Sequence, residues 1–585
     1  MVSKILYGFN RKIFQWLNSA VASQSAFHPC PIQLLGSQLT FSRTRRIKCD
    51  QTKPSCLKCT SSGRVCDGYP LDNVIRNTTT TTWANTKLTQ RAANSINSPD
   101  TQIRTSPCSS SSCTLISATP QLNLGPLCSS LPLFPRSTQE QQLFNVFRHQ
   151  LAPTLGGYLD SGFWSVTLPR IADYQLPVLQ AILAITAIEQ PTTLEPGQSG
   201  LGKQDISIIF YNRAINSLKT LLSNEGPSQP IVLLTCFLFI CFEFKRGNAE
   251  VALNHLQSGL GILCAHEVPP IDDRSELSDI NDQLVRAFYR LSIQSSLVGR
   301  QPPASFHRSL KDPSSYTKAI FTSLTDARES LTSIFVRSLR PTHLEGNVDN
   351  SDAALDEKRS RRGDYIVQLQ EWNSRLGLFM IDCLPNPSQQ DMRVIRIMRI
   401  QSLVASIWNA TTVPSSAEDF SHECAFDSCV AEFDKILSLA ALCIDDDDTT
   451  TSASTLSSSD SSATYPAPSF SLEMGIIFAL YFTAIKCRSP DTRRRASYFL
   501  SQVNPQREGM WDAMVLRAIS QYVVEFEESG CLGSVTVDPE TWPLEEQRIH
   551  GIYIDPHCDL QGRVQKVTFV WRPGVWRDWE KNIKF

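Results

Sequence analysis

The sequence contains little charge and no long apolar run. Asp, Glu, Lys and Arg make up 19% of its 585 residues, whereas about 25% is usual in globular proteins. The longest apolar run covers residues 231–242 and is broken by Thr235. Because a membrane-spanning helix needs about 20 apolar residues, we predict a buried core helix there and no membrane partner. The 18 cysteines are scattered, which is not typical of a disulfide framework and fits a reducing compartment.

Acidic residues are missing from the N-terminal segment. Residues 1–49 contain no Asp or Glu, and the first seventy residues carry a net charge of +8, against −2 for the whole chain. A mitochondrial transit peptide is also poor in acidic residues, so that alternative stays open. The asymmetry indicates a basic, nucleic-acid-binding end on an acidic body.

Two polar tracts divide the chain. Residues 71–137 are rich in Ser, Thr and Pro and contain few acids, so we predict a disordered linker. Since this tract has no apolar heptads, we predict no coiled-coil dimer. A second tract at 449–469 follows Asp445–Asp448 and is predicted to be a polar loop within the body.

The remainder, residues 138–585, is predicted to be a large all-α domain, which makes the fold class mostly α. Residues 178–188 are nearly all apolar, as in a buried helix. An earlier apolar helical pattern is expected to stop at Pro153. The best strand candidate is Val564–Trp571. A further apolar stripe has helical spacing and comprises Tyr211, Ala214, Ile215, Leu218 and Leu222.

Four cysteines lie close together within the basic end of the chain. Their spacing is C-x6-C-x2-C-x6-C, formed by Cys49, Cys56, Cys59 and Cys66. Four thiolates suit one tetrahedral zinc ion, and basic neighbours lower the pKa of the thiols. Chance clustering or a disulfide pair is the alternative explanation, and it is disfavoured because C-x2-C spacing with a basic flank is specific. A redox motif at the central C-x2-C is disfavoured because no βαβ pattern surrounds it.

Residues 42–70 resemble the fungal binuclear zinc cluster DNA-binding domain, in which six cysteines hold two zinc ions. The resemblance makes the four cysteines the third to sixth ligands of the family. It also implies that Arg45 and Arg46 read guanine edges in CGG-like half-sites. Arg43 and Lys48 would then contact phosphates.

The chain departs from this family at the first two cysteines, whose places are taken by Leu39 and Ser42. As written, it could hold at most one zinc ion with four thiolates, or recruit Cys30 or His28. Two hypotheses remain open. In the first, the DNA-binding domain has decayed. In the second, residues 1–41 come from an intron read as coding sequence. We therefore predict that residues 1–41 are disordered or mis-annotated.

The body resembles the regulatory domain that follows such zinc clusters in fungal transcription factors. Weak matches occur in the family's order, including residues 147–153, 241–244, 255–260 and 481–488. The resemblance implies a helical regulatory domain with no established catalytic chemistry.

Other motifs favour no enzyme. His149 and His255 lie on predicted helices and are expected to be surface or packing residues. Gly259-x-Gly261 has no preceding strand, which a dinucleotide-binding loop requires. The arginines at 359, 361 and 362 are predicted to lie on a solvated charged loop.

We therefore predict a zinc-dependent, sequence-specific regulator of RNA polymerase II genes, located in the nucleus, with DNA and the transcription machinery as partners. The alternative is a regulator that has lost DNA binding and acts through protein contacts or small-molecule sensing.

Overall fold

The computed structural model of this chain describes most of the predicted helical body. The described residues are 134, 136–189, 206–224, 229–265, 276–303, 306, 320–339, 352–411, 423–455, 470–529, 542–559, 563–571 and 577–585. Helices dominate these residues, which confirms the mostly α fold class. No helix among them is long and apolar enough to span a membrane.

The first described helices contain two π-helical turns, each followed closely by a proline. They are α4 (Thr138–Val146), η1 (Phe147–Leu151), α5 (Ala152–Gly156), η2 (Phe163–Thr167) and α6 (Leu168–Ala172). The prediction that Pro153 ends the helix is wrong, because α5 continues to Gly156. In η1 the amide of Ala152 donates to the carbonyl of Phe147, five residues earlier. This wider turn accommodates the ring and missing N–H of Pro153 without ending the helix.

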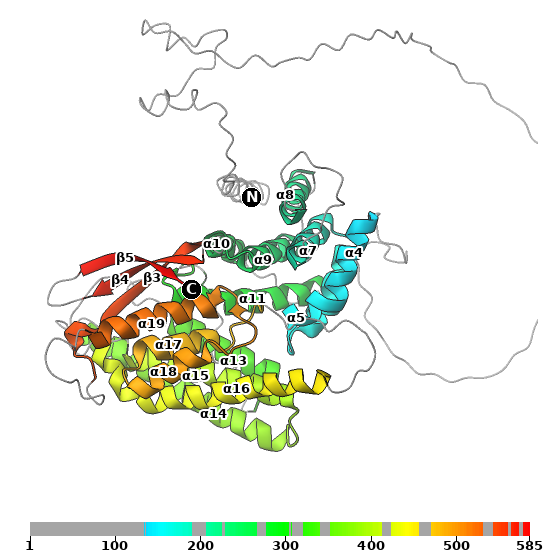
Figure 1. The fold of residues 1–585 in the computed structure, drawn as a ribbon. Coiled ribbons are helices and arrows are strands. Elements are labelled where there is room, and N and C mark those ends of the chain that lie inside the picture. The colour runs from blue at the N-terminus through cyan, green and yellow to red at the C-terminus, as the bar shows by residue number, and fades with distance from the viewer. Residues whose placement is uncertain are drawn as a thin grey trace, which may run out of the picture. The chain divides into compact units, whose positions relative to one another are not determined.

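The next group of helices lies between α4 and the sheet in Figure 1 and includes the apolar helices α7 and α9. It comprises α7 (Leu176–Glu189), α8 (Ile206–Asn224), α9 (Gln229–Lys245), α10 (Ala249–Ala265) and α11 (Glu276–Leu297). Every residue of α9 from Ile231 to Phe244 is buried, as the apolar run predicts. The predicted stripe from Tyr211 to Leu222 lies on the face of α8 that packs into the hydrophobic core, and all five of its side chains are buried.

A second group of helices follows. It comprises α13 (Leu324–Ser338), α14 (Asp352–Asp382), α15 (Gln389–Thr411), η5 (Glu423–Cys429), α16 (Val430–Thr455), α17 (Ile477–Lys486), α18 (Pro490–Phe499) and α19 (Ala513–Ser529). Helix α16 includes residues 449–455, so this part of the predicted polar loop is helical. Residues 456–469 of the same loop lie outside the described residues.

The three arginines expected on a loop lie on α14 instead. Arg359 and Arg361 pair with Asp356 and Glu357, one helical turn earlier, at 2.5 and 2.6 Å. Such spacing favours a helix, and the sequence prediction missed it. Arg362 points inward and donates to Oδ1 of Asn409 at 2.9 Å.

Strands add to the predicted all-α body. A short hairpin joins β1 (Arg507–Glu508) to β2 (Trp511–Asp512), and η7 (Glu545–Gln547) precedes the sheet. The antiparallel sheet has the order β3–β4–β5, formed by β3 (Ile549–Asp559), β4 (Val564–Trp571) and β5 (Arg577–Lys584). Strand β4 has the predicted bounds.

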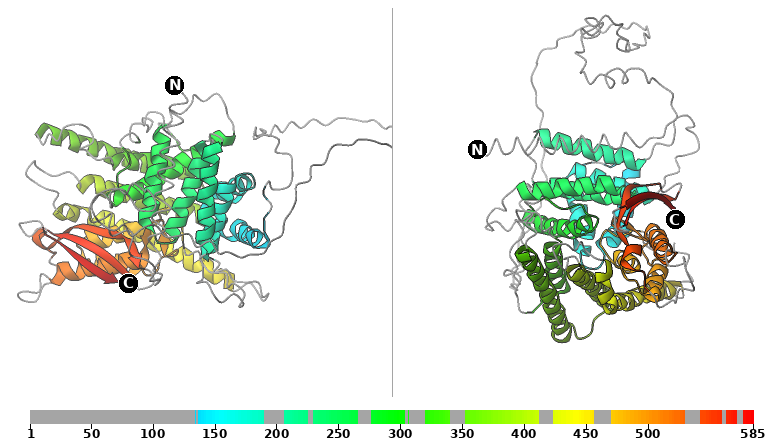
Figure 2. Two further views of the ribbon diagram at one scale, coloured as in Figure 1. Left: turned by 90° about the horizontal axis from the view of Figure 1, so that it is seen from above. Right: turned by 90° about the vertical axis from the view of Figure 1, so that its left-hand side faces the viewer.

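The sheet packs on helices through its aromatic side chains. Strand β3 contacts α10, and β5 contacts α19 (Figures 1 and 2). Phe569 of β4 is fully buried, and its ring centroid lies 4.9 Å from that of Tyr522 on α19. Trp579 of β5 lies 4.9 Å from Phe526 of the same helix.

Candidate functional site

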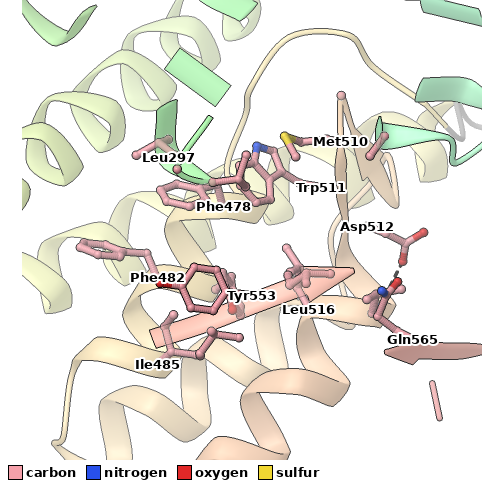
Figure 3. Close-up of a pocket in the computed structure, with 18 of the residues that line it drawn as sticks. Leu297, Phe478, Phe482, Ile485, Met510, Trp511, Asp512, Leu516, Tyr553 and Gln565 are labelled. Atoms are coloured by element: carbon pink, nitrogen blue, oxygen red, sulfur yellow. Dashed lines mark hydrogen bonds between the residues drawn. The ribbon is translucent and has the colours of Figure 1, made fainter. Parts of the chain in front are cut away.

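A cavity of about 390 Å³ lies where the helical layers meet the sheet. Its walls come from the α9–α10 turn, the end of α11, Trp408 of α15, helix α17, the β1–β2 hairpin and the start of α19. Strands β3 and β4 also contribute. Figure 3 shows the side chains of Phe482, Ile485, Leu516 and Tyr553 gathered around it. The cavity therefore depends on segments that are far apart in the sequence.

Aromatic rings form a continuous part of the cavity wall. The ring centroid of Trp511 lies 4.8 Å from that of Phe478, and Phe478 stacks on Phe482 at 5.9 Å. Phe482 in turn lies 6.3 Å from Trp408. Rings at these separations attract one another, so this wall is apolar and held in place.

The charged side chains at the cavity have partners. Arg507 pairs with Asp512 at 2.6 Å. Lys486 pairs with Glu423, also at 2.6 Å. Burial lowers the pKa of His550 below its ordinary value, which favours its neutral form. The indole nitrogen of Trp511 differs, because it is buried and has no hydrogen-bond partner among the described residues.

Helix α17, which carries much of the aromatic wall, is held at its N-terminus by Glu508. The carboxylate of Glu508 accepts from the amides of Gly475, Ile476 and Ile477 at 2.9, 3.0 and 3.0 Å. Burial raises the pKa of Glu508 to about 7 despite these three bonds. A carboxylate in this position satisfies amides that have no partner within the helix.

A buried ion cluster anchors the sheet next to α17. Glu527 of α19 accepts from Arg488 at 2.8 Å and from Arg493 at 2.9 Å, and all three side chains are fully buried. Burial alone would raise the pKa of the Glu527 carboxyl. The two guanidinium groups outweigh burial, so this pKa lies below its ordinary value. The amide of Ile549, the first residue of β3, also donates to Glu527 at 2.9 Å. The strand is thereby positioned by the cluster.

The histidines and the glycine pair have structural positions, as predicted. His149 is exposed on η1. His255 is buried, its Nε2 lies 2.8 Å from the hydroxyl of Tyr211, and burial lowers its pKa to about 3. A Cβ atom at Gly259 would lie 2.3 Å from Phe288, so this glycine permits close helix packing.

The predicted zinc and DNA-binding residues lie outside the described residues. They are Cys49, Cys56, Cys59, Cys66, Arg43, Arg45, Arg46 and Lys48. Four thiols are nevertheless a donor set that zinc accepts. The described helices and strands contain no group of three or more His, Cys, Asp or Glu residues able to hold a metal ion.

Comparisons with known proteins address this N-terminal cluster directly. Residues 43–72 match the fungal Zn(2)-Cys(6) binuclear cluster domain. This range contains all four clustered cysteines and begins after Leu39 and Ser42, the two departures from the family pattern. The presence of the domain implies zinc binding, in agreement with the predicted cofactor.

Curated relatives match a larger part of the chain. The aspercryptin biosynthesis cluster-specific transcription regulator atnN of Emericella nidulans is 24% identical over 378 residues, covering 61% of this chain and 57% of the relative. The transcription regulator lscL of Purpureocillium lilacinum is 26% identical over 238 residues, covering 40% of this chain and 51% of the relative. The transcriptional regulatory protein moc3 of Schizosaccharomyces pombe is 68% identical over 28 residues, which cover 5% of this chain and 6% of that protein.

The chain thus spans slightly more than half the length of the first two relatives. No solved structure gives a significant match. The family match and the relatives together support the resemblance of this chain to fungal Zn(2)-Cys(6) cluster transcription factors.

Proposed function

We propose that this protein binds DNA in a sequence-specific, zinc-dependent manner and regulates transcription by RNA polymerase II in the nucleus. The observation that carries the proposal is the run of four cysteines behind a basic stretch, at the position of the family match. A single zinc ion held by four thiolates would order this short segment, because it is too small to bury an apolar core.

The basic residues divide into two proposed roles. Arg45 and Arg46 donate to the O6 and N7 acceptors of guanine, which supports recognition of CGG-like half-sites. Arg43 and Lys48 neutralise phosphates and set the position of the domain on the duplex. The acidic remainder of the chain is the regulatory part and the contact with the transcription machinery.

An electrophoretic shift assay with the purified full chain tests this proposal. A duplex with a CGG half-site should bind more tightly than a scrambled duplex, and binding should weaken as salt rises, because counterions are released. Arg45→Ala should cost about 1–3 kcal/mol of binding free energy and reduce the preference for CGG. Lys87→Ala, a matched change outside the cluster, should leave that preference unchanged.

Zinc content provides an independent measurement. Elemental analysis of the full chain should give about one zinc ion per chain, since four thiolates suit one tetrahedral ion. Cys56→Ser should lose both the zinc and the shift. Equal shifts for wild type and Cys56→Ser would contradict the proposed zinc dependence.

The second candidate function is regulation without DNA binding. It is favoured by one specific observation, the replacement of the first two family cysteines by Leu39 and Ser42. A zinc-loaded chain that binds CGG and scrambled duplexes equally weakly would support this candidate over the first.

A further inference from the structure

The cavity beside α17 has the size and lining of a small-molecule site. Its volume of about 390 Å³ lies within the roughly 300–1,000 Å³ of pockets that hold such ligands. The rings of Trp511, Phe478 and Phe482 form one wall, and Leu516 of α19 lies among the apolar residues that complete the lining. Flat, rigid surfaces of this kind suit an aromatic or aliphatic molecule.

The charges around the cavity favour an uncharged occupant. Arg507 is neutralised by Asp512, and Lys486 by Glu423, so a charged ligand would have to break an existing ion pair. Removing one partner from a buried pair is unfavourable, because the other charge is left without compensation. His550 adds no charge, since burial lowers its pKa.

We propose that this cavity binds an uncharged, largely apolar small molecule. The molecule enters past Tyr553, which is 63% exposed on β3. Because it contacts α17 and the sheet at once, it stabilises their association. Regulation of transcription by this ligand rests on the proposed function; binding of the ligand does not.

Titration with prodan, an uncharged naphthyl ketone whose emission shifts to shorter wavelength in apolar surroundings, tests the site in the full chain. We expect saturable binding of one prodan per chain and a higher melting temperature. Leu297→Trp places a larger side chain in the wall of the cavity and should weaken binding at least tenfold. Leu378→Trp, an equal change on the exposed side of α14, should leave the affinity within twofold.

A further variant keeps the proposal testable if Leu297→Trp fails to fold. Tyr553→Ala removes an exposed ring at the entrance and should also weaken binding.

The outcomes separate the cavity from the proposed function. Absence of saturable prodan binding, or equal affinity of wild type and both cavity variants, would overturn the site. Because the titration needs neither DNA nor zinc, a chain that binds prodan but shifts no duplex would leave the cavity standing and count against the DNA-binding function alone.

Discussion

Replacing Glu508 by glutamine should remove a pH dependence from the stability of the helical body. Glu508 is 5% exposed and lies against the N-terminal amides of α17. Two effects oppose each other here. Burial disfavours the charged carboxylate, whereas three amide donors and the helix dipole favour it. Burial prevails, since the pKa is raised from its ordinary value of 4.5 to about 7.

The sign of the effect follows from proton linkage. Between pH 4.5 and 7 the folded chain holds a proton on Glu508 that the unfolded chain has lost. The stability contributed by this group is therefore present at low pH and falls as the pH rises through that window. A shift from 4.5 to about 7 corresponds to about 3 kcal/mol, at about 1.4 kcal/mol per pKa unit.

Urea denaturation followed by far-ultraviolet circular dichroism at pH 5, 6, 7 and 8 measures this difference. Wild type and Glu508→Gln should have similar stabilities at pH 5, where both side chains are neutral. By pH 8 the wild type should have lost about 3 kcal/mol relative to the variant. Glu525→Gln, an equal change at an exposed position of α19, should run parallel to wild type. A wild type that gains stability over Glu508→Gln with rising pH would show that the amides and dipole outweigh burial.

Three other predictions concern packing, the ion cluster and zinc. Gly475→Ala should destabilise the chain by about 1–3 kcal/mol, because its Cβ would lie 2.2 Å from an oxygen of Glu508. Gly363→Ala on α14 should be neutral or stabilising by up to about 1 kcal/mol, because a Cβ there meets nothing within 4 Å. Calorimetry that ranks the two glycine variants in the opposite order would contradict this packing. Glu527→Gln should cost about 3–5 kcal/mol, because two buried guanidinium groups lose their counter-charge. Arg494→Ala breaks an exposed pair and should cost less than about 1 kcal/mol, so equal denaturation midpoints for these two variants would refute the role of the cluster. Chelation of zinc should abolish the DNA shift while the circular dichroism of the helical body stays unchanged; a loss of helix signal would refute that independence.

Local patterns in the sequence were sufficient to predict the central helices. The apolar run in α9 and the stripe on α8 are periodic over several turns, and burial of one face is what such periodicity means. The helix end predicted at Pro153 was wrong, because whether a proline ends a helix depends on the backbone of the turn before it. The π-helical turn before it, set by the bond from Ala152 to Phe147, cannot be read from residue types.

Strand β4 was predicted, but β3 and β5 were not. In β4 the buried Val567 and Phe569 alternate with less buried neighbours, which is the pattern of a strand with one face covered. Strand β5 has mostly polar residues, and all of them except Trp579 and Ile583 are exposed. Its position is determined by pairing with β4 and by packing on Phe526, which are long-range contacts.

The cavity depends on the part of the fold that the sequence indicates least clearly. Phe478, Phe482 and Ile485 have the i, i+4, i+7 spacing of an ordinary core face, and nothing in α17 distinguishes a cavity wall from a packed core. The difference is made by β3, which places Tyr553 near these side chains without filling the space between them. The register of β3 is irregular between Ile554 and Cys558, so alternation along the strand is lost at the cavity. A sequence pattern could therefore locate the wall of this site but not the space that it encloses.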